Sequence, residues 1–178
     1  VFDLPGRINA LLSTMPSGHQ YTPERILYEH THLPYYVPFL PPERTDRVER
    51  TMRGGEGNTI HGLLGLRSSR ISLFQPFRFC ADCAGADHDS HGVSYWHRGH
   101  QLPGTWVCAT HDTILQEYRT LSSFPPYDFI SLGRLRRLNL PTEPAIRAEE
   151  TSQGLKRLAD DTSCLLANRI RPTGLPCI

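Results

Sequence analysis

The sequence predicts a mainly helical protein with one small zinc-knuckle or zinc-ribbon element. Apolar residues recur at helical spacing on both sides of a cysteine- and histidine-rich region, which indicates helices before and after it. Within that region, two pairs of metal-ligand residues with matched spacing indicate a zinc module. We therefore expect three parts: a helix-turn-helix-like helical part at residues 1–72, a Cys3His zinc module at 73–120 and a helical extension at 121–178.

The composition limits the functional classes that fit this chain. It has 178 residues, of which 38% are hydrophobic and 21% charged, and its net charge is +1. This charge gives no general attraction to nucleic acid or membranes, so any DNA contact must come from a local patch. No apolar run approaches the about 18 residues of a spanning helix, and the first residues lack the pattern of a signal peptide. Because the chain starts at Val1 without a methionine, we expect a fragment of a longer intracellular protein.

Two helices are expected at the N-terminal end. Apolar residues from Leu4 onward repeat at helical spacing, and Asp3 can cap this helix at its start. Thr22 is a favoured N-cap residue and Pro23 suits the first helical position, so a second helix is expected to begin there. Four prolines among ten residues then predict an extended, aromatic-packed connector over Leu33–Pro42.

A third helix is predicted over Glu43–Arg53, where arginine recurs every three residues with acidic residues between. Gly54–Gly57 ends it, and Asn58–Thr59 can cap a fourth helix that runs through Ile60–Leu66. Helix, glycine turn and helix in this order are compatible with a helix-turn-helix, although an ordinary pair of packed helices has the same pattern.

Residues beyond the cysteine-rich region predict two further helices. A short helix is expected at Thr113–Tyr118, a break at Pro125–Tyr127 and a longer amphipathic helix over Glu149–Ile170. Cys164 falls on the apolar face of the longer helix, so it is expected in the core rather than at a metal. Cys177 has no assigned role.

Two residue pairs predict a zinc site. Cys80 and Cys83 form a C-x2-C pair, and Cys108 and His111 repeat the same gap with 24 residues between the pairs. Zinc prefers four thiolate or imidazole ligands in a tetrahedron, and a two-residue gap lets both side chains of a tight turn face one ion. The alternative is a pair of redox thiols beside an unrelated Cys and His. Five cysteines without a secretion signal favour the metal site over a disulfide framework.

Further candidate ligands lie between the two pairs. Four histidines could replace His111, and two aspartates could make the site open and catalytic: His88, His91, His97, His100, Asp87 and Asp89. A catalytic zinc keeps a position for water and commonly has a Glu nearby as general base. No Glu lies between Phe77 and Glu117, and neither the deaminase pattern nor H-E-x-x-H occurs. We therefore expect a structural zinc and no enzymatic activity.

Several blocks of residues carry a resemblance to a known family. They occur in order between Leu27 and Leu115, with the two ligand pairs among them: His30–Tyr36, Pro38–Leu40, Leu63–Gly65, Ser69–Arg70 and Tyr95–Gly104. This ordered combination closely resembles the TniQ/TnsD family of transposon target-selection proteins. Two differences are visible, because Ala81 and Ala109 stand where family members usually have proline, which should not affect ligation.

The resemblance implies a helical, helix-turn-helix-like N-terminal part beside zinc knuckles whose ligands are the two pairs described above. Members of the family choose where a cut-and-paste transposon inserts, in the bacterial cytoplasm at the nucleoid. TnsD-like members bind a chromosomal attachment site, TniQ-like members ride on an RNA-guided CRISPR effector complex, and both hand the site to the AAA+ ATPase TnsC. The family resemblance also implies that Trp96, Arg98 and Gln101–Pro103 pack around the zinc knuckle. The family's opening segment ahead of Asp3 is absent here, and many TnsD-like members extend further at the C-terminus.

Arginine supplies 18 of the 19 basic residues, and its forked side chain suits contacts with phosphates and base edges. Six arginines near the fourth helix, the zinc module and the C-terminal part are candidate DNA contacts: Arg67, Arg70, Arg78, Arg134, Arg136 and Arg137. The arginines of Glu43–Arg53 alternate with acidic residues and are expected to form surface ion pairs instead. The expected function is binding of double-stranded attachment-site DNA and recruitment of TnsC.

Two other functions are compatible with the sequence. An adaptor would bridge a CRISPR effector complex to the ATPase without reading DNA, and the low net charge and the aromatic stretch Tyr35–Phe39 suit a partner surface. A metalloenzyme would need an open zinc position and a general base. Steep dependence of DNA binding on salt would favour the DNA reader over the adaptor.

Overall fold

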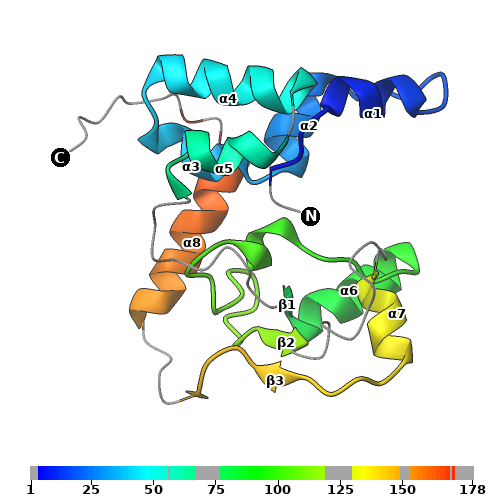
Figure 1. Ribbon diagram of the computed structural model, residues 1–178. Helices are drawn as coiled ribbons and strands as arrows, with labels where there is room; N and C mark the ends of the chain where they lie inside the picture. Colours follow the sequence, from blue (N-terminus) through cyan, green and yellow to red (C-terminus); the bar gives the residue numbers. More distant parts are fainter. Residues whose placement is uncertain are drawn as a thin grey trace. The chain divides into compact units, whose positions relative to one another are not determined.

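The computed structural model describes residues 4–55, 57–66, 77–118, 130–148, 153–168 and 170. The chain divides into two compact units, of which one combines Val1–Leu73 with Cys164–Ile178 and the other is Phe74–Ser163. Helices dominate the first unit, and the second combines helices with a small sheet (Figure 1). These findings confirm the predicted mainly helical fold with a small Cys- and His-containing module. No helix in the described ranges is long and apolar enough to cross a membrane.

The first unit begins with two short helices, α1 (Ile8–Thr14) and α2 (Pro23–His30). α2 begins as predicted, because the Thr22 side chain accepts a hydrogen bond from the backbone N–H of Arg25 at 3.1 Å. α1 begins later than the sequence indicated. The backbone of Arg7, directly before it, is left-handed with a φ of 59°, so the helix cannot extend back through this residue.

The proline-rich connector is helical, and the prediction of an extended segment is wrong. It forms α3 (Leu33–Tyr36) and a 3₁₀ turn (Val37–Phe39). Pro34 and Pro38 each lie in the first turn of their helix, where a backbone N–H has no intrahelical partner to lose. The hydroxyl of Thr31 connects this segment to α2, since it donates to the carbonyl of Leu27 at 2.6 Å and accepts from the N–H of Leu33 at 3.1 Å.

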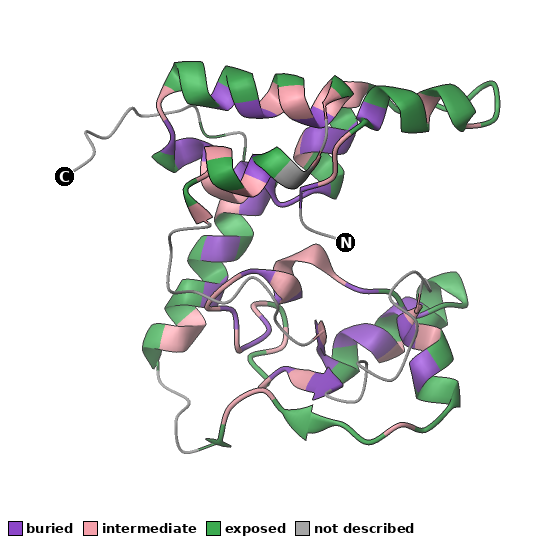
Figure 2. Ribbon diagram, in the orientation of Figure 1, coloured by how far each residue is buried: buried purple, intermediate pink, exposed green. Residues whose placement is uncertain are grey.

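Two further helices complete the first unit, α4 (Pro42–Gly54) and α5 (Ile60–Leu63). α4 confirms the predicted third helix, whereas α5 is shorter than the sequence indicated. The buried face of α4 carries Thr45, Val48 and Met52, and most of its other residues are exposed (Figure 2). The turn after α4 lies against Gly6, where a β-carbon would come within 2.6 Å of the carbonyl oxygen of Gly55.

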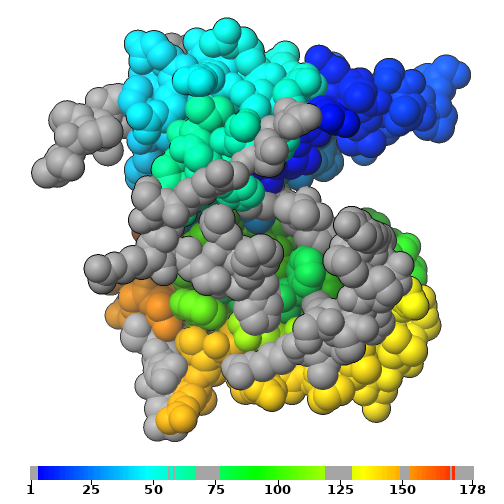
Figure 3. Space-filling view, in the orientation of Figure 1, coloured from blue at the N-terminus to red at the C-terminus, as the bar shows by residue number. Residues whose placement is uncertain are grey.

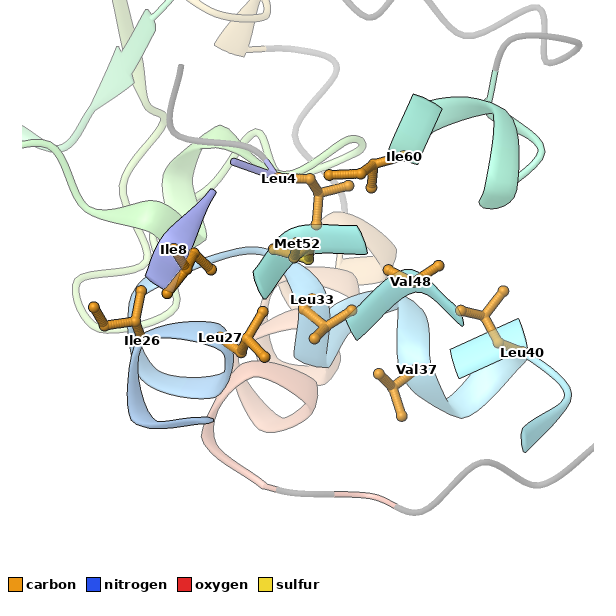
Figure 4. Close-up of a cluster of buried hydrophobic side chains, with 10 residues drawn as sticks. All are labelled: Leu4, Ile8, Ile26, Leu27, Leu33, Val37, Leu40, Val48, Met52 and Ile60. Atoms are coloured by element: carbon orange, nitrogen blue, oxygen red, sulfur yellow. The ribbon is translucent and has the colours of Figure 1, made fainter. Parts of the chain in front are cut away.

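The core of this unit draws on every helix from α1 to α5. Figure 4 shows its ten buried apolar side chains: Leu4, Ile8, Ile26, Leu27, Leu33, Val37, Leu40, Val48, Met52 and Ile60. Leu27, Leu33 and Met52 are fully removed from solvent. Burial of an apolar side chain of this size stabilises a fold by about 1.5–3 kcal/mol, so this cluster can hold the helices together by itself.

The second unit contains a three-stranded antiparallel sheet in the order β1 (Phe77–Phe79), β2 (Gln116–Tyr118) and β3 (Glu143–Pro144). The short helix predicted at Thr113–Tyr118 is therefore wrong. Its last residues pair with β1, where Tyr118 lies opposite Phe77 and its ring stacks on Phe79 with centroids 5.1 Å apart. Strand pairing and aromatic burial outweigh the helical spacing of a segment this short.

A helix that the sequence did not indicate follows β1. α6 (Ala81–His91) begins directly after Cys80 and ends at Gly92, whose left-handed backbone donates a hydrogen bond to the carbonyl of His88 at 2.8 Å. The C-x2-C pair therefore lies at the start of a helix rather than in an isolated tight turn. The buried positions of α6 are small or polar, Cys83, Ala84 and Asp87, so no apolar repeat marks it.

The remaining helices are α7 (Leu132–Arg137) and α8 (Gln153–Ala167). Ser131 caps α7 by accepting a hydrogen bond from the N–H of Arg134 at 3.2 Å. α8 confirms the predicted long C-terminal helix. The prediction that Cys164 is buried is wrong, because the buried residues of α8 are Ala159, Thr162 and Leu166 and Cys164 faces solvent. The expected cap Asp3, the break Pro125–Tyr127 and Cys177 lie outside the described residues.

Candidate metal centre

The four predicted metal ligands come together in the second unit. Cys80 lies just ahead of α6 and Cys83 lies in its first turn. Cys108 and His111 lie in a tight turn in which the N–H of Asp112 donates to the carbonyl of Cys108 at 2.9 Å. One ligand atom from each of the four residues lies within 4.8 Å of the other three. The three cysteines are buried and His111 is half-buried, so only the imidazole edge borders solvent.

The distances between the ligand atoms fit a tetrahedral zinc ion. The Nδ1 atom of His111 lies 3.6 Å from the Cys80 sulfur, 3.3 Å from the Cys83 sulfur and 3.6 Å from the Cys108 sulfur. The sulfurs of Cys83 and Cys108 are 3.6 Å apart. Zn–S bonds of about 2.3 Å and Zn–N bonds of about 2.05 Å place tetrahedral S···S pairs about 3.8 Å apart and S···N pairs about 3.6 Å apart. The cluster is therefore compatible with zinc.

The electrostatics of the cluster favour a bound cation. Burial, followed by the hydrogen bond and charge of Cys108, raises the pKa of the Cys83 thiol. Burial also raises the pKa of the Cys108 thiol, although the backbone N–H groups of His111 and Thr110 oppose this effect. Three thiolates cannot form side by side in a buried site without a compensating positive charge. A divalent metal supplies that charge and allows the thiols to ionise.

Thr113 supports the cluster from outside the ligand set. Its hydroxyl oxygen lies 3.2 Å from the Cys80 sulfur, where it can donate a hydrogen bond to a thiolate. Such contacts orient a ligand and adjust its charge. The sequence does not indicate this residue, because no spacing rule marks a threonine two positions after a candidate histidine ligand.

Aromatic side chains pack beside the metal centre. Trp96 contacts Phe77, Phe79 and Tyr118, with ring centroids 5.1, 6.4 and 6.2 Å away. Its indole N–H donates to the carbonyl of Ile130 at 2.8 Å, so the buried ring has its polar group satisfied. Trp96 is therefore a packing residue of the small sheet, and its packing against the knuckle itself stays a prediction.

Arg78 lies inside the second unit and is completely buried. Its guanidinium donates to the carbonyls of Thr105 and Leu102, the latter at 3.1 Å, and lies over the Trp106 ring at 4.7 Å. Burial lowers the pKa of Arg78, and the charge of Glu117, opposite it in the sheet, partly offsets this effect. A guanidinium enclosed in this way has no access to a phosphate, so we do not keep Arg78 as a DNA contact.

Gln101 holds the backbone of Arg78 in place. Its side-chain oxygen accepts from the Arg78 N–H at 3.1 Å, and its side-chain nitrogen donates to the Arg78 carbonyl at 2.6 Å. The amide thus pairs with the free edge of β1 as a neighbouring strand would. The sequence placed Gln101 in a packing turn, and the structure adds that it completes the hydrogen bonds of β1.

The other candidate ligands have different surroundings. His88, His91 and Asp89 of α6 are exposed and belong to neither cluster of ligand atoms within the described residues. His97 and His100, in contrast, lie near Cys83, and their ligand atoms fall within 4.8 Å of one another and of its sulfur. Burial, with smaller effects of the charges on His97 and Arg78, lowers the pKa of His100 to about 3, so its imidazole is neutral.

The other candidate arginines differ in how free their side chains are to contact DNA. Arg134 and Arg137 of α7 are exposed, in a part of the chain that lies at the surface of its unit (yellow in Figure 3). Arg136 is exposed as well, but it connects α7 to α6, since its Nη1 amino group donates to the carbonyl of Ala84 in α6 at 2.8 Å and to the hydroxyl of Ser94, beyond α6, at 2.9 Å. Arg67 and Arg70 lie outside the described residues.

Two arginines of α4 contact the preceding turn of their helix. Arg53 forms an ion pair of the expected kind, 3.6 Å from the Glu49 carboxylate, whereas the side chain of Arg50 donates to the backbone carbonyl of Asp46 at 3.3 Å, which is not an ion pair. These contacts join positions four residues apart on an exposed helix face, where each ion pair contributes less than about 0.5 kcal/mol. They describe a solvated surface rather than a binding site.

Comparison with known proteins adds two findings. A sequence profile of the TniQ family matches residues 3–115. The chain is also similar to the transposon Tn7 transposition protein TnsD of Escherichia coli, with 28% identity over 191 aligned positions that cover 94% of this chain. The chain spans 38% of the length of that relative. Both findings confirm the resemblance that the residue blocks indicated.

Proposed function

The chain belongs to the TniQ family, and from this premise we propose that it selects target sites for a Tn7-like transposon. In this function it binds double-stranded attachment-site DNA and recruits an AAA+ ATPase of the TnsC type. The observation that carries the proposal is its similarity, over 94% of its length, to a protein named for Tn7 transposition. We propose no catalytic step for this chain, and we place the protein in the bacterial cytoplasm.

Zinc has a structural role in this proposal. Cys80, Cys83, Cys108 and His111 would hold one Zn²⁺ with all four positions filled by protein. A filled tetrahedron leaves no position for water, so the ion contributes folding free energy rather than Lewis-acid chemistry. The zinc module proposed at residues 73–120 would share the compact unit Phe74–Ser163 with the first part of the extension proposed at 121–178, and the helical part is proposed at 1–72.

Arg134 and Arg137 are the DNA contacts that we propose among the described residues. Both are exposed, and the carboxylates nearest in sequence on the C-terminal side begin only at Glu143. Arginine at such a position can neutralise a phosphate and release a counterion. Arg67 and Arg70 stay candidates from the sequence. Arg136 is a weaker candidate because its guanidinium already bonds to Ala84 and Ser94.

Capture of DNA by the intact parent protein tests the proposal. The purified protein is mixed with sheared host DNA at moderate salt, without an RNA-guided complex, and the retained fragments are sequenced. We expect enrichment of one locus. Binding to that locus should weaken steeply between about 50 and 200 mM salt, because counterion release dominates the affinity. Retention without enrichment, or a flat salt response, would contradict direct reading of DNA.

Charge reversal identifies the contacts. The pair Arg134→Glu and Arg137→Glu should weaken binding and lower the slope of log affinity against log salt by about 2, one for each lost phosphate contact. The matched control is the pair Arg44→Glu and Arg47→Glu, which changes the charge equally on the exposed face of α4. An equal loss in both pairs would indicate a general charge effect instead of a site on α7.

An adaptor without DNA reading is the second candidate function. The net charge of +1 and the internal bonding of Arg78 and Arg136 favour it, because they remove any general attraction to DNA and engage two of the six candidate arginines within the protein. The adaptor would bridge a CRISPR effector complex to the ATPase. It predicts that the folded, zinc-loaded protein retains TnsC and the effector complex on a column, while the Arg134 and Arg137 pair of substitutions leaves targeting unchanged.

A further inference from the structure

The metal centre borders a second group of ligand atoms. Cys83, His97 and His100 each place one such atom within 4.8 Å of the other two. Cys83 is at the same time a member of the Cys3His cluster. The two groups therefore meet at one sulfur, that of Cys83.

His100 is the buried member of the second group. It is 7% exposed, and its Nδ1 atom has no hydrogen-bond partner in the part of the chain that the structure describes. Buried polar atoms nearly always have a partner, so an unpaired ring nitrogen needs an explanation. The ring stacks on His97, with centroids 5.0 Å apart and 25° between the planes. A metal bound at Nδ1 would satisfy this nitrogen, and a neutral imidazole is the form that binds metals.

His97 is held as a metal-binding histidine commonly is. Its Nε2 atom lies 2.9 Å from a carboxylate oxygen of Asp87, which is itself only 7% exposed. Ligating histidines usually donate their other ring N–H to such a carboxylate, which fixes the orientation of the ring and strengthens the ligand. With Nε2 paired to Asp87, Nδ1 is the nitrogen left for an ion. The side chain of His97 is 32% exposed, so solvent reaches this side of the group.

We propose that Cys83, His97 and His100 form a second divalent-metal position that shares the Cys83 sulfur with the Cys3His centre. A thiolate has the lone pairs to bind two cations at once. Three protein ligands leave the fourth coordination position to water, so this position is open and exchangeable, unlike the filled Cys3His centre. The chain would then bind two zinc ions, the second more weakly than the first. This inference goes beyond target-site selection and depends on it in no step.

Zinc stoichiometry tests the proposal directly. Zinc-free full-length chain is dialysed to equilibrium against Zn²⁺ at up to a tenfold excess, and bound metal per chain is obtained from the difference in zinc concentration across the dialysis membrane, measured by mass spectrometry. We expect two ions for the natural sequence and one for the double variant His97→Ala, His100→Ala. The matched control is His88→Ala with His91→Ala, two exposed histidines of α6 outside both groups, which should keep two ions.

A milder variant covers the case in which removal of the buried His100 disturbs folding. Asp87→Asn keeps the shape of the side chain but removes the charge that orients His97. It should weaken the second binding step about 10- to 100-fold and leave the first unchanged. Co²⁺ provides the readout, because its visible spectrum reports each ligand set separately while circular dichroism reports the fold.

One ion per chain in the natural sequence at tenfold excess would overturn the proposal, as would two ions in the double variant. Zero ions in folded protein would overturn both this position and the structural zinc. Absence of DNA binding in a protein that still carries two ions would contradict only the proposed target-site selection. The two proposals can therefore fail independently.

Discussion

Arg78 stabilises, from within, the unit that contains the candidate metal ligands. Its buried guanidinium satisfies the carbonyls of Leu102 and Thr105 and provides positive charge opposite the buried Glu117. We expect Arg78→Met to lower the free energy of unfolding by about 3–5 kcal/mol, because it leaves a buried carboxylate and two carbonyls without this partner. Urea unfolding followed by tryptophan fluorescence measures this, since Trp96 and Trp106 both lie in this unit.

The control for Arg78 is Arg137→Met, which makes the same substitution at an exposed position of α7. It should change the free energy of unfolding by less than about 0.5 kcal/mol. If Arg78→Met were equally mild, the guanidinium would contribute no net stability to this unit. The comparison matters for function, because a destabilised Arg78 variant that fails to bind DNA would say nothing about phosphate contacts.

Single residues differ in how far their roles follow from sequence. The clustering of the four candidate ligands was predictable, because zinc restricts both the residue types and the spacing of a site, and their side chains do come together. The burial of Arg78 was not predictable, since a sequence shows that an arginine is charged but not whether the folded protein encloses its side chain. Thr113 and Gln101 act through single hydrogen bonds to atoms that only the folded chain brings near them.

At the scale of elements, Gly6 fixes how the N-terminal segment meets the turn after α4. A β-carbon at Gly6 would lie 2.6 Å from the Gly55 carbonyl oxygen and 2.6 Å from the Gly57 nitrogen, both backbone atoms. Gly6→Ala should therefore force the two segments apart and lower the free energy of unfolding by about 1–3 kcal/mol. Unfolding in urea, followed by far-ultraviolet circular dichroism, reports the loss.

Gly54→Ala is the matched control for Gly6. A β-carbon there has no neighbour within 4 Å, and Gly54 is the last residue of α4. Alanine favours a helix over glycine by up to about 1 kcal/mol, so this variant should be neutral or slightly more stable. A Gly6→Ala variant as stable as Gly54→Ala would mean that the close approach of Gly6 to the turn does not constrain the fold.

The errors at this scale have physical causes. Four prolines indicated an extended connector, but Pro34 and Pro38 occupy first-turn positions that tolerate proline. Gln116–Tyr118 is a strand because β1 and aromatic packing lie beside it, which local spacing does not show. α6 was missed because its buried face is made of Cys83, Ala84 and Asp87, so its packing depends on the metal centre more than on an apolar stripe.

At the scale of the whole molecule, the two units differ in whether a metal can add to their stability. The first has a ten-residue apolar core supplied by α1 to α5 and contains none of the candidate ligands. The second has buried apolar side chains of its own, among them Leu102, Val107 and Leu135, and its candidate ligands form a cluster with Leu115. A metal that closes the long loop between Cys83 and Cys108 would therefore add to the stability of the second unit alone.

Removal of the metal should consequently unfold one unit and spare the other. With a strong chelator, we expect Trp96 and Trp106 to become solvent-exposed, shown by a red shift of tryptophan emission, because both report on the unit that contains the metal ligands. The helical signal of α1 to α5 should largely persist, because the core of those helices contains no metal ligand.

Cys108→Ser should give the same partial unfolding without chelator, and added zinc should reverse only the chelator effect. Complete loss of helical signal would mean that the first unit depends on the second for its stability, and an unchanged emission would mean that the ligand cluster holds its shape without an ion.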